Sequence, residues 1–177
     1  MCQLNIESDQ IDNSDKLNKT LIAMSVKDFD QFMVAKFPGI FSNRFKPMSE
    51  TCMCWGFEIG PGWHAIIHNL CQKLDLIGNL IGFTVVASQV KEKYRSLRFY
   101  YDIIDNPKVT NVCRTNEEKR LAVEIVEDMV DAAEERSKRT CEVCGEYGEC
   151  HSLAGWYTTL CNQHFQERAS KIHVPPQ

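Results

Sequence analysis

Two pairs of metal-binding side chains near the C-terminus constrain this fold more than any other feature of the sequence. Cys141 and Cys144 are separated by two residues and followed by Gly145, and Cys161 and His164 repeat that spacing further along the chain. Two intervening residues let a tight turn direct both ligands at one tetrahedral ion, and the longer segment brings the second pair back. The sequence therefore predicts one bound zinc ion. Because four protein ligands leave no position for water, we expect a structural zinc.

Residues 140–177 are predicted to form a zinc-finger module around these ligands. Residues 147–148 and 155–160 are typical of two short strands, and Cys161 is expected to open a helix that runs through Ala169. The turn at residues 141–145, which we call the knuckle, is followed by a hairpin and by a helix that carries the second ligand pair. This order of elements is that of a treble-clef-like finger.

The same architecture occurs in nucleases of the HNH type, so an enzymatic alternative stays open. Such an enzyme needs a histidine general base and further ligands for a catalytic divalent ion. His151 is the candidate base, and no acidic or amide partner follows it at a suitable interval. No Ser-His-Asp order, glycine-rich phosphate loop or dinucleotide motif is present either. We therefore expect a protein that is not an enzyme.

The N-terminal segment, residues 1–37, is expected to form an arm and a helix. Residues 1–15 are polar and are predicted to be a loose arm or a short edge element. Residues 16–37 carry apolar side chains at near-helical intervals, and Ser25 is a suitable N-cap for a second helical segment. The Pro-Gly pair at 38–39 is expected to end this helix.

Residues 38–139 are predicted to form the main α+β domain, which contains two long helices. The first begins at Pro61, which suits a first helical turn, and ends before Gly78. The second covers residues 117–138, with Thr115 or Asn116 as its cap. Both segments carry an apolar face at helical spacing.

The strands of this domain are predicted from β-branched and aromatic runs. Residues 82–90 and 97–104 are typical of a β-hairpin, and residues 54–59 of a further short strand. The expected fold is a small antiparallel sheet packed by helices, with the finger at its C-terminal end. Large aromatic side chains are expected in the core, namely Trp55, Phe57, Trp63 and Trp156.

His64, His68 and Cys71 lie at i, i+4 and i+7 of the predicted helix from Pro61, a spacing that could align three metal ligands. Cys52 and Cys54 nearby keep a second zinc site open. A surface stripe beside the apolar face is the interpretation that we favour, because spacing without geometry decides little.

A cationic row is predicted at the turn of the hairpin. Lys91, Lys93 and Arg95 alternate along one strand with Arg98 close by, so that period-two geometry would place them on one face. Such a row could bind the phosphates of a nucleotide, with a nearby tyrosine stacked on the base. The alternative is a solvated strand face, where lysines blunt a sheet edge.

The net charge and the composition indicate which partners and which cellular compartment to expect. The 177 residues carry a net charge of -4, which does not favour binding to nucleic acid through the whole surface. No apolar run approaches the ~20 residues that cross a bilayer, and no secretion signal opens the chain. We therefore expect a cytoplasmic protein without membrane contact, whose nine cysteines bind zinc or stay reduced.

Three segments resemble a family of small, mostly uncharacterised proteins from tailed phages and prophages. They are residues 56–63, residues 89–100, and residues 141–145 together with 155–164, and the likeness covers residues 38–165. The resemblance implies a phage origin, a C-terminal zinc finger and the host cytoplasm, and it assigns no reaction.

These observations lead to one expected function and two alternatives. The first is a zinc-stabilised accessory protein that binds and neutralises a host protein, in counter-defence for example, and it rests on the resemblance. The second is a sponge for a signalling nucleotide, with phosphates on Lys91, Lys93, Arg95 and Arg98. The third is an HNH-like nuclease or a nucleic-acid binder.

Overall fold

The computed structural model describes residues 4–106 and 115–172, which form an α+β fold. The helices are α1 (Leu4–Ala23), α2 (Val26–Lys36), α3 (His64–Ile81), α4 (Asn116–Ser137) and α5 (Asn162–Ile172). The strands are β1 (Phe57–Glu58), β2 (Phe83–Lys93), β3 (Ser96–Asp105), β4 (Glu149–Leu153) and β5 (Trp156–Leu160). Short 3-10 helices cover Cys52–Trp55 and Pro61–Trp63.

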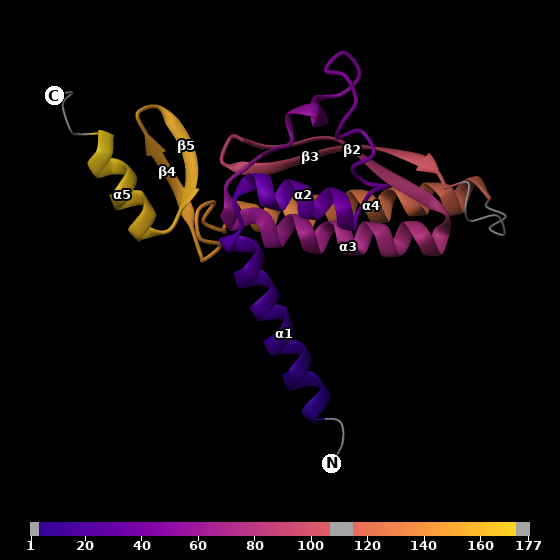
Figure 1. Cartoon of the computed structure of the whole chain (residues 1–177), viewed down its shortest axis with the longest axis horizontal. Helices are drawn as coiled ribbons and strands as arrows, with labels where there is room; N and C mark the ends of the chain where they lie inside the picture. The colour runs from indigo at the N-terminus through magenta and orange to yellow at the C-terminus, as the bar shows by residue number, and fades with distance from the viewer. Residues whose placement is uncertain (1–3, 107–114, 173–177) are drawn as a thin grey trace.

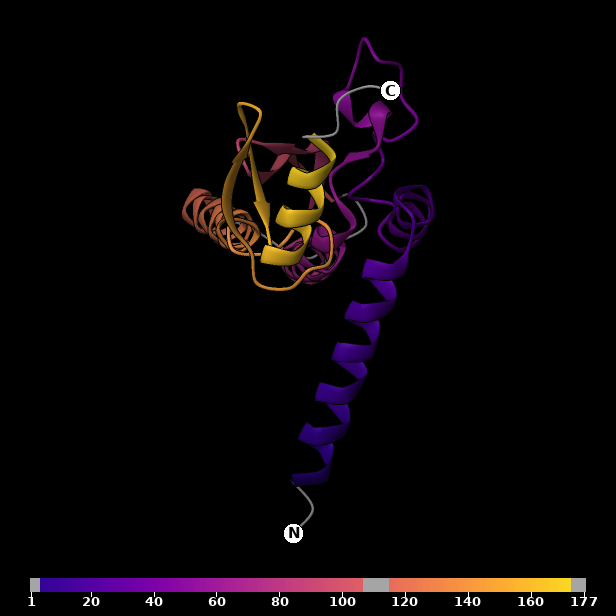
Figure 2. The same ribbon diagram turned by 90° about the vertical axis from the view of Figure 1, so that its left-hand side faces the viewer.

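The main domain has two layers (Figures 1 and 2). Helices α2, α3 and α4 lie side by side beneath the long β2–β3 hairpin, and α1 extends away from them. The module of β4, β5 and α5 lies at one end of these layers, close to the C-terminal end of α1. The predicted order of an α+β domain followed by a C-terminal finger is therefore confirmed.

The three-stranded sheet is mixed, with the order β1-β2-β3. β2 and β3 pair antiparallel as predicted, with a bulge between Ala87 and Gln89. β1 is reduced to two residues and runs parallel to β2, with Phe57 opposite Val90. The expectation of a purely antiparallel sheet is therefore wrong at this strand. The chain reaches β2 from β1 through the whole of α3, and such a crossover allows parallel pairing.

Helix α4 covers the free edge of β3 with side-chain acceptors. The backbone N–H of Leu97 donates to Ser137 Oγ at 2.8 Å, and that of Phe99 donates to Glu134 Oε1 at 3.1 Å. These outward N–H groups would otherwise be open to pairing with another chain. The helix thereby closes one edge of the sheet.

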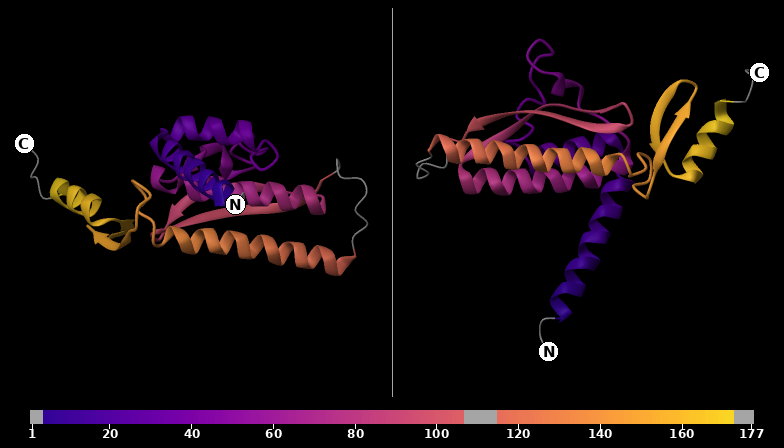
Figure 3. Two further views of the ribbon diagram at one scale, coloured as in Figure 1. Left: turned by 90° about the horizontal axis from the view of Figure 1, so that it is seen from below. Right: turned by 180° about the vertical axis from the view of Figure 1, so that it is seen from behind.

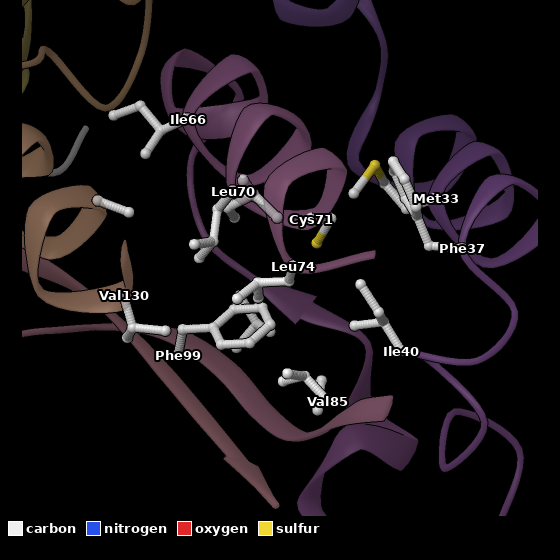
Figure 4. Close-up of a cluster of buried hydrophobic side chains, with 14 of the residues drawn as sticks. Met33, Phe37, Ile40, Ile66, Leu70, Cys71, Leu74, Val85, Phe99 and Val130 are labelled. Atoms are coloured by element: carbon white, nitrogen blue, oxygen red, sulfur yellow. The ribbon is translucent and has the colours of Figure 1, made fainter. Parts of the chain in front are cut away.

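The core lies between the sheet and the helices (Figure 4). Leu70, Leu74 and Cys71 of α3 point toward side chains of β2, β3 and α2 such as Val85, Phe99 and Met33. Burial of this apolar surface is the main favourable term in folding. The largest fully buried side chain is that of Trp63, as predicted, and its Nε1–H donates to the Thr140 carbonyl at 2.7 Å.

The predicted helix caps are confirmed at two positions. Ser25 accepts a hydrogen bond from the backbone N–H of Asp28 at the start of α2. Thr115 and Glu118 form a reciprocal capping box at the start of α4. In both cases a short polar side chain satisfies a backbone donor that the helix itself leaves unpaired.

Two predicted helix boundaries are wrong. The arm expected over residues 1–15 is helical from Leu4 onward, and residues 4–23 contain no Gly or Pro that would interrupt a helix. Gly78 lies inside α3, where a Cβ would approach the Phe83 carbonyl oxygen to 2.6 Å. Gly82 ends that helix instead, in a left-handed conformation with φ 76°.

In the part of the chain described here, no helix is both long and apolar enough to cross a membrane.

Candidate metal centre

The C-terminal module brings the four predicted ligands together. Cys141 and Cys144 lie in a turn closed by the bridge between Thr140 and Tyr147, and Gly145 follows with φ 79°. Cys161 directly precedes α5, and His164 lies in the first turn of that helix. A knuckle, the β4–β5 hairpin and a helix thus form the predicted treble-clef-like arrangement.

The ligand atoms lie close enough together to share one ion, all within 4.8 Å of one another. The Sγ atoms of Cys144 and Cys161 lie 3.9 Å apart, and His164 Nδ1 is 3.1 Å from Cys161 Sγ and 3.5 Å from Cys141 Sγ. Metal bonds of roughly 2.3 Å to sulfur and 2.0 Å to nitrogen would separate such atoms by about 3.5 to 3.8 Å. The four residues could therefore hold one metal ion.

The sulfur atoms are thiols and form no disulfide. The backbone N–H of His164 is the main cause that lowers the pKa of Cys161 to about 7, whereas burial raises the pKa of Cys144 to about 12. Metal binding replaces thiol protons. A cation at this position would relieve the cost of burying the Cys144 thiolate.

The knuckle packs directly on the turn that precedes α3. The backbone N–H of Gly62 donates to the Glu142 carbonyl at 2.8 Å. A Cβ on Gly62 would overlap the Cys141 carbonyl oxygen, and one on Gly60 would overlap that of Glu142. The Gly-Pro-Gly turn is thus explained by the close approach of two backbones.

Two further contacts hold the module in place. Thr159 Oγ1 of β5 donates to the Arg95 carbonyl in the β2–β3 turn at 2.8 Å. A Cβ on Gly145 would lie 2.6 Å from Ile22 Cδ1 of α1, so the knuckle also packs against α1. The group of four candidate ligands is therefore connected to three separate segments of the main domain.

His151, the candidate base of the nuclease alternative, is engaged in packing. Its ring stacks on Phe165 with centroids 4.1 Å apart, and its Nε2 lies 3.1 Å from the Leu160 carbonyl oxygen. With Nε2–H donated to this carbonyl, Nδ1 is the ring nitrogen that remains as an acceptor. This contact links the finger's hairpin to α5.

His64, His68 and Cys71 are buried in the core, so the surface stripe that we favoured is wrong. The His64 ring stacks on Phe29 at 3.8 Å, and its Nδ1 lies 2.8 Å from the Leu21 carbonyl oxygen. Burial lowers the pKa of both histidines and raises that of the Cys71 thiol. Because α1 and α2 cover this face of α3, its polar residues are enclosed as well.

These three side chains form no metal cluster in the described ranges. Within residues 4–106 and 115–172, the three cysteines and His164 at the finger are the one group of His, Cys, Asp or Glu that could hold a metal ion. Cys52 and Cys54 lie in the 3-10 helix at Cys52–Trp55 and are free.

The cations predicted as one row occupy different surroundings. Lys91 and Lys93 alternate along β2, with their amines 5.7 Å from the ring centre of Tyr100 and 5.4 Å from that of Tyr94. Arg95 lies in the β2–β3 turn with φ 63°. The strand periodicity therefore ends before Arg95 and cannot place it with the lysines.

Arg98 is neutralised locally. Its Nη1 donates to Glu134 Oε2 on α4 at 2.6 Å, in an ion pair with both side chains partly buried. The same carboxylate accepts from the edge of β3, so Arg98 helps α4 to cover that strand. Sequence reasoning missed this partner because it lies 36 residues away on another element.

Two of the four aromatic side chains expected in the core are exposed. Phe57 and Trp63 are buried, but Trp55 and Trp156 expose 62% and 81% of their surface. Trp156 lies at the tip of the finger's hairpin, after a two-residue turn at Ala154 and Gly155. The end of β5 that contacts the main domain is the opposite one, at Thr159.

Comparison with protein-family models, with curated proteins and with solved structures finds no match to this chain. The resemblance to phage proteins therefore stays a prediction.

Proposed function

We propose that this chain is a zinc-stabilised protein that acts by binding another protein and catalyses no reaction. Three thiolates and one imidazole at tetrahedral spacing are the donors that zinc prefers. Four protein ligands close the coordination sphere, so the ion would stabilise the finger and leave no position for a substrate or an activated water. The ligand distances reported above support this assignment.

The exposed aromatic surface of the finger carries the proposal of partner binding. Trp156, Tyr157 and Tyr147 expose 81%, 61% and 67% of their surface. Tryptophan and tyrosine dominate the binding energy of protein interfaces, since they bury a large area at a low cost in conformational entropy. Exposed aromatic side chains of this kind are candidates for direct contact with a partner protein.

The finger holds these side chains on a rigid support. β4 and β5 pair along their full length, from Glu149 opposite Leu160 to Leu153 opposite Trp156. The base of the hairpin is held by the candidate metal ligands and by the hydrogen bond from Thr159 Oγ1 to the Arg95 carbonyl of the main domain. Such preorganisation reduces the entropic cost of binding.

The resemblance to tailed-phage proteins supports a host protein as the partner. In this proposal the chain acts in the cytoplasm of the infected cell and neutralises a host factor by occupying its surface, in counter-defence for example. The nuclease alternative is less well supported because the described residues hold no second His, Cys, Asp or Glu group that could bind a catalytic ion. The nucleotide sponge loses support because Arg98 is paired with Glu134.

Co-purification from the host cell tests this function. The chain with Trp156→Ala and Tyr157→Ala should lose a partner that the unchanged chain retains, at equal zinc content. Trp55→Ala is the matched control, since it removes an exposed tryptophan outside the finger. A partner lost equally from the finger variant and from this control would contradict the proposed surface, and the recovery of no partner at all would contradict the function.

A further inference from the structure

Helices α3 and α4 run side by side beneath the sheet (Figure 3). A groove lies between them, lined by side chains of both helices. It encloses about 490 Å³, and its apolar lining includes Ile66, Leu70 and Met129. Leu70 is buried and Met129 is partly exposed. Small-molecule sites are concavities of this size with a mostly apolar lining and a few convergent polar groups.

A second hollow of about 740 Å³ continues from this groove toward the end of α2. The two share Asn69, Lys73 and Arg136, so these side chains stand where the hollows meet. Lys36 of α2 lines the second hollow from the other side. Three cations from three helices thus line two adjoining hollows.

The charges of these three cations are not neutralised within the described residues. Ion pairs there join other side chains, and none includes Lys36, Lys73 or Arg136. Asp75 and Asp128 also line the hollows, which leaves a net positive charge in a chain whose overall net charge is -4. A local excess of positive charge attracts and concentrates anionic ligands.

Lys36 is held in place by the core behind it. Its Nζ lies 2.9 Å from His68 Nε2 and 5.4 Å from the ring centre of Phe32. Burial is the main cause that lowers the pKa of His68. A neutral His68 can accept a hydrogen bond from the Lys36 side chain, and this contact fixes the position of that side chain at the rim.

We propose that this groove binds a small molecule that carries a phosphate next to an apolar or aromatic body. Lys73 and Arg136 contact the phosphate oxygens, and the Asn69 amide donates a further hydrogen bond. Guanidinium and ammonium groups form strong charge-assisted hydrogen bonds with phosphate. The body of the ligand lies on Leu70 and Met129. This site lies outside the finger's aromatic surface and goes beyond the proposed function.

Methyl NMR of the full-length, zinc-loaded chain with labelled methionines tests this proposal, with phenyl phosphate as the probe. Met129 lies in the groove, whereas Met48 is exposed on the loop before β1 and serves as the internal control. The Met129 signal should shift with a dissociation constant of about 1 mM or lower, and the Met48 signal should not move. Inorganic phosphate should bind more weakly, because it lacks the apolar body.

Charge removal identifies the phosphate contacts. Lys73→Met and Arg136→Met should each weaken phenyl phosphate about tenfold or more, the effect of losing one charge-assisted hydrogen bond. Lys93→Met removes the same charge from the hairpin and should leave the affinity unchanged. No Met129 shift, equal binding of inorganic phosphate, or equal loss in Lys93→Met would each overturn the proposal. None of these results tests whether the finger binds a partner protein, so the two proposals can fail separately.

Discussion

The backbone N–H of Gly62 donates a 2.8 Å hydrogen bond to the carbonyl oxygen of Glu142, and this contact joins the main domain to the metal knuckle. The two residues are 80 positions apart in the sequence. Neither side chain takes part, so the contact depends on the absence of a Cβ at Gly62. The turn before α3 therefore serves two roles, as the start of a helix and as the surface on which the finger packs.

Gly62→Ala should destabilise the protein by roughly 1 to 3 kcal/mol, the usual cost of overpacking. The new methyl group would overlap the Cys141 carbonyl oxygen, which belongs to backbone and cannot rotate away. Urea unfolding measures the effect. Gly39→Ala is the control, because its added Cβ would meet only a Thr84 methyl group at 3.3 Å. Equal midpoints for the two variants would contradict the described packing.

Ser137→Ala should lower the free energy of unfolding by about 1 to 3 kcal/mol, because it leaves a buried backbone N–H without its acceptor. Ser137 is fully buried, and its Oγ accepts from Leu97 N–H at the edge of β3. Ser49→Ala, at an exposed position, provides the baseline. Hydrogen exchange of the Leu97 amide should also accelerate in the first variant and not in the second.

Truncation of the tryptophans at positions 63 and 156 should change the stability of the protein to very different extents. Trp63→Ala empties a fully buried site and should cost about 3 to 5 kcal/mol. Trp156→Ala removes a side chain that is 81% exposed and should change the stability by less than about 0.5 kcal/mol. Thermal and urea unfolding of both variants check this, and a large loss in Trp156→Ala would show that the finger tip is covered.

Stability should fall with acidification, in part through His64. Burial lowers the pKa of this imidazole in the folded chain, so the unfolded chain binds the proton more readily. The contribution of His64 is therefore complete above its unfolded pKa of about 6.5 and is lost as the pH falls from that value through the lower pKa of the folded chain.

Unfolding of the unchanged chain and of His64→Gln at about pH 7.5 and 5.5 measures this contribution, since the window spans the ordinary histidine pKa. Metal release at low pH affects both proteins alike. The variant should therefore lose less stability between the two conditions. An identical loss would mean that His64 is not held neutral by burial.

Local patterns allowed much of the fold to be predicted from the sequence. Ser25 and Thr115 cap helices because their side chains act on backbone donors three residues away. The spacing of the two finger pairs likewise predicts that they meet, and the structure brings them within 4.8 Å. Such features depend on neighbours in the sequence and need no knowledge of the tertiary structure.

The features that the sequence could not predict depend on contacts between distant elements. The burial of His64 follows from coverage by α1 and α2, and the pairing of Arg98 follows from the position of Glu134 on α4. The cations of the groove come from three helices, so no local spacing groups Lys36 with Arg136. Trp63 and Trp156 have the same side chain, and only the packing distinguishes buried from exposed.

The metal content of the purified chain tests the central claim most directly. Elemental analysis by mass spectrometry should find one zinc per chain in the unchanged protein and none in Cys144→Ser with Cys161→Ser, which removes two of the four ligands. A chain that purifies without stoichiometric zinc and still protects the amides of β4 and β5 from hydrogen exchange would contradict the account.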